Sequence, residues 1–525
     1  MKASALWGLT LATLGLVLVS LAPAFHREDQ DVRFVHNVVP LGGELLSITY
    51  GDVDADGSKD VLAALRLEDG RREIHVFLTR PSGSVPAVPD EILEVKSATV
   101  SWGVGEFRPD DPGCELLFLS REGAYSFSPR SASYKGNLQK ISSVEMLLDM
   151  PSDRALPLWS AIADLDGDGV DEVALVGHEG FHLVQVDGTS LGHVPLRVLR
   201  EQSSAMEFNF KVDLVPAVSS QPLSDLFVPG DNPGALRAPP ILFAEESLPV
   251  PLLRDADGDG FLDLLYYHAG EIRLHRYRKE TEGPAYASQA DHTLPLASDA
   301  DWDIRNLELI DAGGSEAVDL MVIRSENTST DYLTPDWEIL LFHDAFAKGR
   351  KLGQPQALLK LEASWLEAYL VQLDGNELLD LGVSAWNLDV PTFFGGKVSI
   401  EHKVSLYLAE SEGDYARKAV ASYDREYSAD DFTPFGRTPA LAADFNGDGL
   451  TDLLEPDAGG RLEILPLRLR KSKPRFADDP SRRVEVNALQ SVVEVEQINQ
   501  DGIGDLIIAQ AEPPQLEIYL SRRRP

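Results

Sequence analysis

The residues of this sequence best suited to chemistry are carboxylates at alternate positions on short loops. In the stretch ADLDGDGVDEVALVG, Asp164, Asp166 and Asp168 alternate with other residues, Gly169 follows, and Glu172 occupies the ninth position counted from Asp164. Carboxylates this close repel one another unless a hard cation lies between them, and calcium selects oxygen ligands on a loop with a glycine at its bend. The stretch therefore predicts a calcium-binding loop.

The same pattern recurs along the chain. Its copies begin at residues 52, 106, 164, 255, 311, 372, 444 and 497. The copies at 52, 164, 255 and 444 are full ones, with an acid at position nine followed by an apolar run. The copy at 497 replaces two acids by amides, and the copy at 372 has Glu377 in place of the glycine. The copies at 106 and 311 keep few acids, and we expect them to hold their shape without metal.

Strand patterns surround these loops. In the first copy, residues 45–50 lead into the loop, residues 61–65 leave it, and residues 73–78 return after a turn at 68–71. A repeat of roughly 50 to 60 residues that contains several short strands is typical of propeller blades. We therefore predict an all-β fold, a β-propeller of seven or eight four-stranded blades, with eight favoured by the number of copies.

The two ends of the chain complement each other. After the last loop only two strands are expected, at 506–509 and 515–520, whereas residues 32–39 precede the first copy without a loop of their own. We expect residues 32–39 to join the last blade, which would close the ring and remove an exposed strand edge. The long interval before the copy at 255 contains the Pro- and Gly-rich segment 216–251, which is either a degenerate blade or a surface insertion.

Composition and charge narrow the class of protein. The chain has 525 residues, of which 43% are hydrophobic and 25% charged, as expected for a globular protein. Its 85 acids against 47 Lys and Arg give a net charge of -38. Phosphate binding requires a basic face, so this balance argues against a nucleic-acid partner.

The first residues resemble an export signal. Lys2 precedes an apolar run that ends in the small residues Ala22, Pro23 and Ala24, so residues 1–24 are interpreted as a signal peptide cleaved before Phe25. The alternative is an uncleaved N-terminal anchor; after cleavage no membrane span is expected in residues 25–525. Because Cys114 is the only cysteine, no intrachain disulfide can form. Calcium bound to the native state would supply stability instead.

Two other interpretations, an EF-hand and a zinc-binding H-E-x-x-H motif, are rejected from the sequence. An EF-hand needs a bidentate Glu at position twelve and a following helix, but position twelve is Ala63, Leu175 or Tyr266 in three copies and β-rich segments follow. The stretch HEGFH at 178–182 matches H-E-x-x-H, which binds zinc only on a helix. Here it spans an apparent hairpin turn. No catalytic motif is recognised, although pairs of acids for glycosidic chemistry stay open.

Taken together, the copies resemble the FG-GAP/VCBS repeats of the integrin α-subunit propeller and of many secreted bacterial proteins. The resemblance covers most of residues 25–525 and implies a propeller that holds four or five Ca²⁺ ions in loops on one face. It also implies side-chain ligands at positions one, three, five and nine and a backbone carbonyl at position seven. The implied ligands are Asp52, Asp54, Asp56, Ser58 and Asp60; Asp164, Asp166, Asp168, Val170 and Glu172; Asp255, Asp257, Asp259, Phe261 and Asp263; Asp444, Asn446, Asp448, Leu450 and Asp452; and Asn499, Asp501, Ile503 and Asp505.

A propeller fold hosts many functions, so the repeats leave the activity open. We expect a secreted, periplasmic or cell-surface protein that binds a protein or carbohydrate ligand, as in adhesion, without catalysis. One alternative is a polysaccharide lyase or hydrolase built on a calcium-braced propeller. Another is a scaffold subunit of a surface complex.

Overall fold

The protein is described by a computed structural model. It covers residues 32–108, 110–130, 137–148, 152–196, 251–268, 271–279, 283–295, 302–310, 318–326, 334–346, 355–376, 378–389, 398–411, 414–428, 438–471 and 473–523. The proposed signal peptide at 1–24 lies outside this part of the chain, and so does the segment 216–251 except for Pro251.

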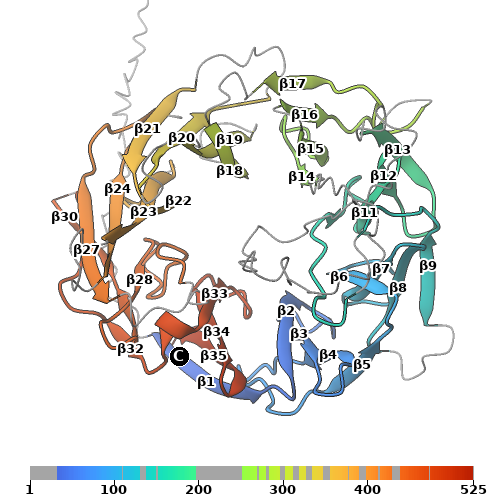
Figure 1. Cartoon of the computed structure of the whole chain (residues 1–525), viewed down its shortest axis with the longest axis horizontal. Coiled ribbons are helices and arrows are strands. Elements are labelled where there is room, and N and C mark those ends of the chain that lie inside the picture. The colour runs from blue at the N-terminus through green and yellow to red at the C-terminus, as the bar shows by residue number, and fades with distance from the viewer. Residues whose placement is uncertain are drawn as a thin grey trace, which may run out of the picture.

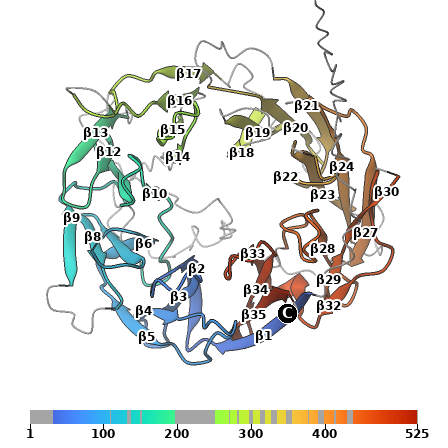
Figure 2. The same cartoon turned by 180° about the vertical axis from the view of Figure 1, so that it is seen from behind.

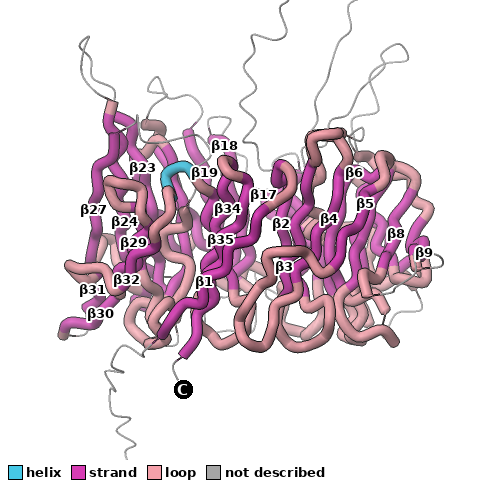
Figure 3. Tube along the Cα trace, turned by 90° about the horizontal axis from the view of Figure 1, so that it is seen from below, coloured by secondary structure: helices cyan, strands magenta, loops and turns pink. Residues whose placement is uncertain are grey.

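The chain forms an eight-bladed β-propeller, which confirms the predicted fold class and the count of eight. Eight antiparallel sheets stand around a central opening (Figures 1 and 2). Seen from the side, the strands run between two loop-bearing faces of a flat ring (Figure 3). Each blade begins with the strand that precedes a copy of the acidic loop, so the sequence repeat and the structural repeat are the same unit.

The first four blades each contain four strands in sequence order. They are β2 (Glu44–Gly51), β3 (Asp60–Arg66), β4 (Arg72–Phe77) and β5 (Glu91–Val95); β6 (Thr99–Gly105), β7 (Glu115–Ser120), β8 (Gly123–Phe127) and β9 (Leu138–Ser142); β10 (Ile162–Ala163), β11 (Glu172–Gly177), β12 (Gly180–Val184) and β13 (Ser190–Pro195); and β14 (Leu252–Arg254), β15 (Asp263–His268), β16 (Glu271–His275) and β17 (His292–Pro295).

The fifth and sixth blades follow the same order, and the sixth carries a small extra hairpin, β25–β26. Their strands are β18 (Trp302–Ile310), β19 (Asp319–Glu326), β20 (Asp336–Phe342) and β21 (Ala357–Glu362); and β22 (Trp365–Val371), β23 (Asp380–Asp389), β24 (Ser399–Tyr407), β25 (Ala409–Ser411), β26 (Asp414–Tyr415) and β27 (Ala421–Ser428).

The seventh blade differs from the four-stranded expectation. Its sheet has three strands, β28 (Leu453–Pro456), β29 (Leu462–Leu465) and β32 (Arg482–Val484), and a separate hairpin of β30 (Leu467–Arg470) and β31 (Lys473–Phe476) is inserted between the last two. The inner-strand position is taken by residues 440–443, which accept only two backbone hydrogen bonds, from Leu454 to Ala440 (2.8 Å) and from Asp452 to Ala443 (2.9 Å).

The last blade closes the ring with the beginning of the chain. It consists of β33 (Val492–Glu496), β34 (Asp505–Ala511), β35 (Pro514–Arg523) and β1 (Val32–Pro40). Strand β1 pairs antiparallel with β35 from Val32 opposite Arg523 to Pro40 opposite Gln515. The strand expected at 32–39 is thus β1, and it occupies the outer edge of the eighth blade (Figure 1).

The core lies between the blades. The second strands are buried on both faces, as in β3 and β11, because each is covered by a neighbouring blade on either side. This explains why these strands are continuous apolar runs and do not alternate. One cluster joins Val39, Leu516 and Ile518 of the last blade to Val61 and Leu65 of the first, so ring closure is also a core contact.

Helical structure is scarce, as expected. In the described part of the chain the helical element is the short 3₁₀ turn η3 (Ala488–Gln490). None of the helices found there has the length and apolar character needed to cross a membrane.

Candidate metal-binding loops

Every copy of the acidic pattern lies between the first and second strands of a blade, or at the equivalent place in the seventh blade. Because the first strands all run in the same direction, these loops gather on one face of the ring. The loop at 311–317 and Glu377 of the loop at 372 lie outside the described residues. The remaining loops give a consistent geometry.

The first acid of each full loop curls the chain around itself. In the first loop, Asp52 accepts hydrogen bonds from the backbone N–H groups of Asp56 (3.0 Å) and Gly57 (2.9 Å). Asp164 and Asp255 do the same in their loops. The glycine at position six has a positive φ in all five glycine-containing loops that begin at 52, 164, 255, 444 and 497, with values between 80° and 89°. A side chain would be strained there, which explains the invariant glycine of the pattern.

This curl gathers carboxylates in three loops. Potential ligand atoms lie within 4.8 Å of one another in the groups Asp52, Asp54 and Asp60; Asp164, Asp166 and Glu172; and Asp255, Asp257 and Asp259. In each of these three loops, the structure thus brings together three of the predicted ligands. Neither Asp56 nor Asp168 belongs to these groups, and in the third loop Asp259 takes the place expected for Asp263.

The two amide-containing loops form no such carboxylate group among the described residues. In the loop at 444, the Asn446 Nδ2 group lies 3.4 Å from the Asp452 carboxylate and donates to it. In the loop at 497, the Asn499 Nδ2 group donates to the Ser521 carbonyl (2.6 Å). Amide donors thus partly satisfy these loops internally, so they offer a cation fewer open oxygens than the full loops.

A position-nine acid, or in the copy at 106 the equivalent acid at position ten, recurs in all eight blades as a buried anchor, and this role was not expected from the sequence. These acids are Asp60, Glu115, Glu172, Asp263, Asp319, Asp380, Asp452 and Asp505, each at most 1% exposed. In seven of them one oxygen accepts the N–H of the second loop residue at 2.8–3.1 Å.

The other oxygen of this acid reaches the end of the third strand. Asp60 accepts from the Thr79 N–H (2.8 Å), Asp380 from Ala409 (2.8 Å) and Asp452 from Leu467 (3.0 Å). Asp263, Asp319 and Asp505 accept equivalent bonds from Tyr277, Asp344 and Ser521. The position-nine acid therefore fastens its loop to the blade. The signal in the sequence is an acid that opens an apolar buried strand, because such an acid must find partners.

Burial changes the acidity of these carboxyl groups. Desolvation raises the pKa of Asp60, Glu172 and Asp263 to about 7 and that of Asp505 to about 6, in spite of the backbone N–H donors that oppose the shift. Neighbouring loop acids contribute to the rise at Asp60, Glu172 and Asp263. A divalent cation among these groups would reverse the shift, because it stabilises the charged form.

The residues present fit a calcium ion in the loops at 52, 164 and 255. All the donors are oxygens, as calcium requires. In the loop at 255, Asp257 Oδ1 is buried and has no hydrogen-bond partner in the part of the chain that the structure describes. Its other oxygen forms an ion pair with Arg276 (3.0 Å), so this loop also holds a competing cation. The loops at 52 and 164 carry no arginine in contact with their grouped carboxylates among the described residues.

Neighbouring loops are also hydrogen-bonded to each other. The N–H at position eight of a loop donates to the carbonyl of the first or second residue of the preceding loop. These bonds run from Cys114 to Asp52 (2.8 Å), Asp171 to Glu106 (2.7 Å), Leu262 to Leu165 (3.3 Å), Thr451 to Gln372 (2.9 Å), Gly504 to Asp444 (2.8 Å) and Lys59 to Ile498 (2.8 Å). The loops are therefore the junctions between blades, and the bond from Lys59 crosses the point where the ring closes.

A buried triad lies between the sixth and seventh blades. Ser384 Oγ is 2.8 Å from His402 Nε2, and His402 Nδ1 is 2.8 Å from Glu455 Oε2. This order of hydroxyl, imidazole and carboxylate is that of a hydrolytic triad. However, Ser384 and His402 are each 1% exposed and Glu455 is fully buried, and the Trp386 ring stacks on the imidazole at 3.8 Å. A substrate cannot reach Ser384 in this arrangement, so the triad is a polar contact between blades.

The H-E-x-x-H stretch has the expected non-helical structure. Strand β11 ends at Gly177 and β12 begins at Gly180, so His178 lies in the turn. His182 is instead the cross-strand partner of His193, with ring centroids 4.6 Å apart. The segments that follow the described acidic loops are strands, which likewise agrees with the rejection of an EF-hand.

Among the comparisons with known proteins, similar proteins were found only among solved structures. No protein-family model matches the sequence, and no curated protein matches it. The chain is similar in structure to the Cps50 (Swd1) β-propeller domain of Myceliophteria thermophila, with 10% identity, a TM-score of 0.34, and coverage of 93% of this chain and 99% of that one.

Two further solved structures are similar at the same level. One is an Agrocybe aegerita lectin that recognises non-reducing terminal N-acetylglucosamine, with 12% identity, a TM-score of 0.36, and coverage of 87% of this chain and 90% of that one. The other is BBS1N in complex with ARL6DN, with 10% identity, a TM-score of 0.32, and coverage of 94% and 98%. At these identities the likeness concerns the fold alone.

Proposed function

We propose that this protein is a calcium-braced β-propeller that acts outside the cytoplasm and binds a protein or carbohydrate ligand without catalysis. The observation that carries the proposal is the gathering of three acid side chains, with oxygens within 4.8 Å of one another, in each of the loops at 52, 164 and 255. Burying such groups together without a cation costs free energy through mutual repulsion. Bound calcium would remove that cost.

Bracing is the role that best suits these loops. They recur around the ring, and a backbone hydrogen bond joins six pairs of neighbouring loops. An ion that stiffens one loop therefore also fixes the neighbouring blade. An ion that recognised a ligand directly would need only one specialised loop.

The location outside the cytoplasm rests on the sequence. The signal-like residues 1–24 and the single cysteine are compatible with export, and calcium outside the cytosol is abundant enough for weak sites. The acidic loops resemble those of FG-GAP/VCBS repeats, and we infer from this resemblance that the protein acts outside the cytoplasm.

The proposal is tested by incubating residues 25–525 with immobilised polysaccharides and candidate surface proteins in calcium, while new polysaccharide chain ends are recorded. Retention without new chain ends is the expected result. New chain ends would establish an enzyme, the alternative role, and would direct mutagenesis to the exposed acids. Absence of retention on every ligand, together with a stable complex recovered with a partner subunit, would favour the scaffold role.

A further inference from the structure

The hairpin β30–β31 of the seventh blade concentrates positive charge in a strongly acidic protein. Its two strands pair in a register that places Arg468 opposite Arg475 and Arg470 opposite Lys473. The alternate positions pair Leu467 with Phe476, and both of these side chains are buried against the blade. One face of the ribbon is therefore apolar and anchored, and the other is entirely cationic.

This arrangement weakens the hairpin. Like charges directly opposite each other on paired strands destabilise a sheet, and an isolated two-stranded ribbon is marginally stable at best. Among the described residues neither Arg470 nor Lys473 forms an ion pair, and both are exposed. The exposed face of the hairpin thus presents four cations two by two, about 5 Å apart across the strands and about 7 Å along them, of which Arg475 is also paired with Asp478 (2.9 Å).

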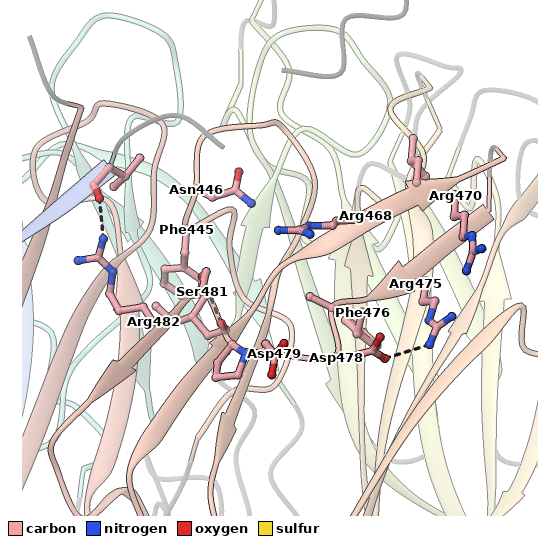
Figure 4. Close-up of a pocket in the computed structure, with 15 residues that line it drawn as sticks. Phe445, Asn446, Arg468, Arg470, Arg475, Phe476, Asp478, Asp479, Ser481 and Arg482 are labelled. Carbon is pink, nitrogen blue, oxygen red and sulfur yellow. Dashed lines mark hydrogen bonds and ion pairs between the residues drawn. The ribbon is translucent and has the colours of Figure 1, made fainter. Parts of the chain in front are cut away.

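A pocket lies beside the cationic face. It has a volume of about 780 Å³ and is lined by the hairpin, the following segment up to Arg482 and the start of the loop at 444. Arg468 extends from its strand toward Asn446, and Arg482 lies on the other side of Phe445 (Figure 4). Arg482 is held there by a hydrogen bond to the Val32 carbonyl (2.6 Å) and by packing over the Phe34 ring.

Polar neutral and acidic groups share the same wall. Asn446, Ser481, Asp478 and Asp479 line the pocket together with the arginines. Asp478 forms an ion pair with Arg475 (2.9 Å), whereas Asp479 is exposed and forms no ion pair with the residues that the structure describes. The pocket therefore offers acceptors for hydroxyl groups next to donors for acidic oxygens.

We propose that this pocket binds an acidic polysaccharide, a chain of sugars that bear carboxylate groups. The arginines would take the carboxylates, because the planar guanidinium matches a carboxylate with two parallel hydrogen bonds. Asp479, Ser481 and Asn446 would take the sugar hydroxyls. The inference rests on the proposed ligand-binding function and names its ligand class and its site.

The mixed wall disfavours other polyanions. A nucleic acid or a phospholipid surface presents closely spaced phosphates that would meet Asp478 and Asp479 as well as the arginines. A sugar chain carries hydroxyl groups between its charges and can be satisfied by both kinds of side chain.

The test measures retention of residues 25–525 on a short oligogalacturonate and on the same oligosaccharide with its carboxylates methyl-esterified. We expect binding to the acid form, loss on esterification and weakening with added salt. The double variant R468Q/R470Q should bind the acid form at least about tenfold more weakly, as expected for the loss of two charge-assisted contacts. R468K/R470K should retain part of the affinity, because it keeps the charge.

A matched control removes two exposed cations elsewhere. K96Q/R154Q changes the net charge equally on the first three blades and should bind like the wild type, and circular dichroism should show that all variants are folded. Equal binding by R468Q/R470Q and the wild type would overturn the assignment of the pocket but would leave ligand binding itself intact. Binding to the esterified sugar alone would overturn the ligand class, and cleavage of the oligosaccharide would instead contradict the proposed non-catalytic function.

Discussion

At the scale of single residues, the position-nine acid is the most informative group in the molecule. The sequence pattern suggests only a metal ligand, but in five blades both of its oxygens already accept backbone hydrogen bonds. A carboxylate oxygen has lone pairs enough to accept a hydrogen bond and still face a cation. The group therefore has a structural role that does not depend on calcium.

The blade at 372 allows this role to be measured apart from metal binding, because its loop is not among the predicted calcium sites. Asp380→Ala would leave the buried N–H group of Leu373 and the partly buried N–H group of Ala409 without acceptors. At about 1–3 kcal/mol for each lost partner, unfolding should become easier by about 2–6 kcal/mol. Denaturant titration without calcium measures this.

The control for that substitution is Asp374→Ala, which removes a less buried acid of the same loop that accepts an exposed hydrogen bond from the Asn376 N–H. It should cost less than about 1 kcal/mol. If the two variants lost equal free energy of unfolding, the buried Asp380 carboxylate would stabilise the fold no more than the less buried Asp374 carboxylate does.

Glu115 gives a pH dependence with a defined sign. Burial raises the pKa of its carboxyl group from the ordinary 4.5 to about 7. Between these values the folded protein holds a proton that the unfolded chain has lost, so the contribution of Glu115 to stability is complete below about 4.5 and is lost as the pH rises through about 7.

We therefore expect the melting temperature of Glu115→Gln, relative to the wild type, to rise as the pH is increased from 5 to 8, because Gln cannot ionise. Melting curves of the variant and the wild type, recorded side by side in chelator across this pH range, would check the prediction. A difference between the two proteins that stays constant with pH would mean that the pKa of Glu115 is not raised by folding.

At the scale of elements, ring closure depends on β1. This strand covers β35 along nine residues, and Val39 is fully buried in the cluster shared by the first and last blades. Burial of a valine side chain alone stabilises the fold by about 1.5–3 kcal/mol. Without β1, strand β35 would be an exposed edge that invites association between molecules.

Deletion of residues 25–40 should accordingly lower the melting temperature of the whole protein and promote aggregation. Differential scanning calorimetry and light scattering would report both effects. Removal of residues 524–525 serves as a control of chain shortening. A truncated protein that melts cooperatively at the wild-type temperature would show that the seam between β1 and β35 is dispensable.

At the scale of the whole molecule, the loops couple the blades. They are joined by backbone hydrogen bonds around most of the ring, so ions in the loops at 52, 164 and 255 would stabilise several junctions at once. Calcium at about a hundred times its dissociation constant adds about 2.7 kcal/mol for each independent site. Chelation should therefore lower the melting temperature clearly.

This expectation is checked by thermal melts in calcium, in chelator and in chelator followed by excess calcium, together with calorimetric titration of the ion. Asp54→Asn/Asp166→Asn should reduce both the stoichiometry and the calcium-dependent shift, while the melt in chelator stays close to that of the wild type. An identical wild-type melt with and without calcium would contradict the bracing role.

The sequence alone determined the repeat, and with it the fold class, and it favoured eight blades over seven. This was possible because the loop pattern is local: alternate acids and a glycine at position six are required by the geometry of a single turn, and Gly57 and Gly169 have the positive φ that this turn demands. The pairing of residues 32–39 with the last blade could also be anticipated, because the repeat left one strand missing.

Only the tertiary structure decided which distant groups meet within a blade and across blades. The anchoring bonds of Asp380, the contact of Ser384 with His402 and Glu455, and the pocket beside Arg468 join residues that are distant in sequence or that depend on an irregular blade. A periodic pattern predicts the regular unit. It does not predict where the seventh blade replaces a regular connection with a hairpin, because that exception has no repeat to reveal it.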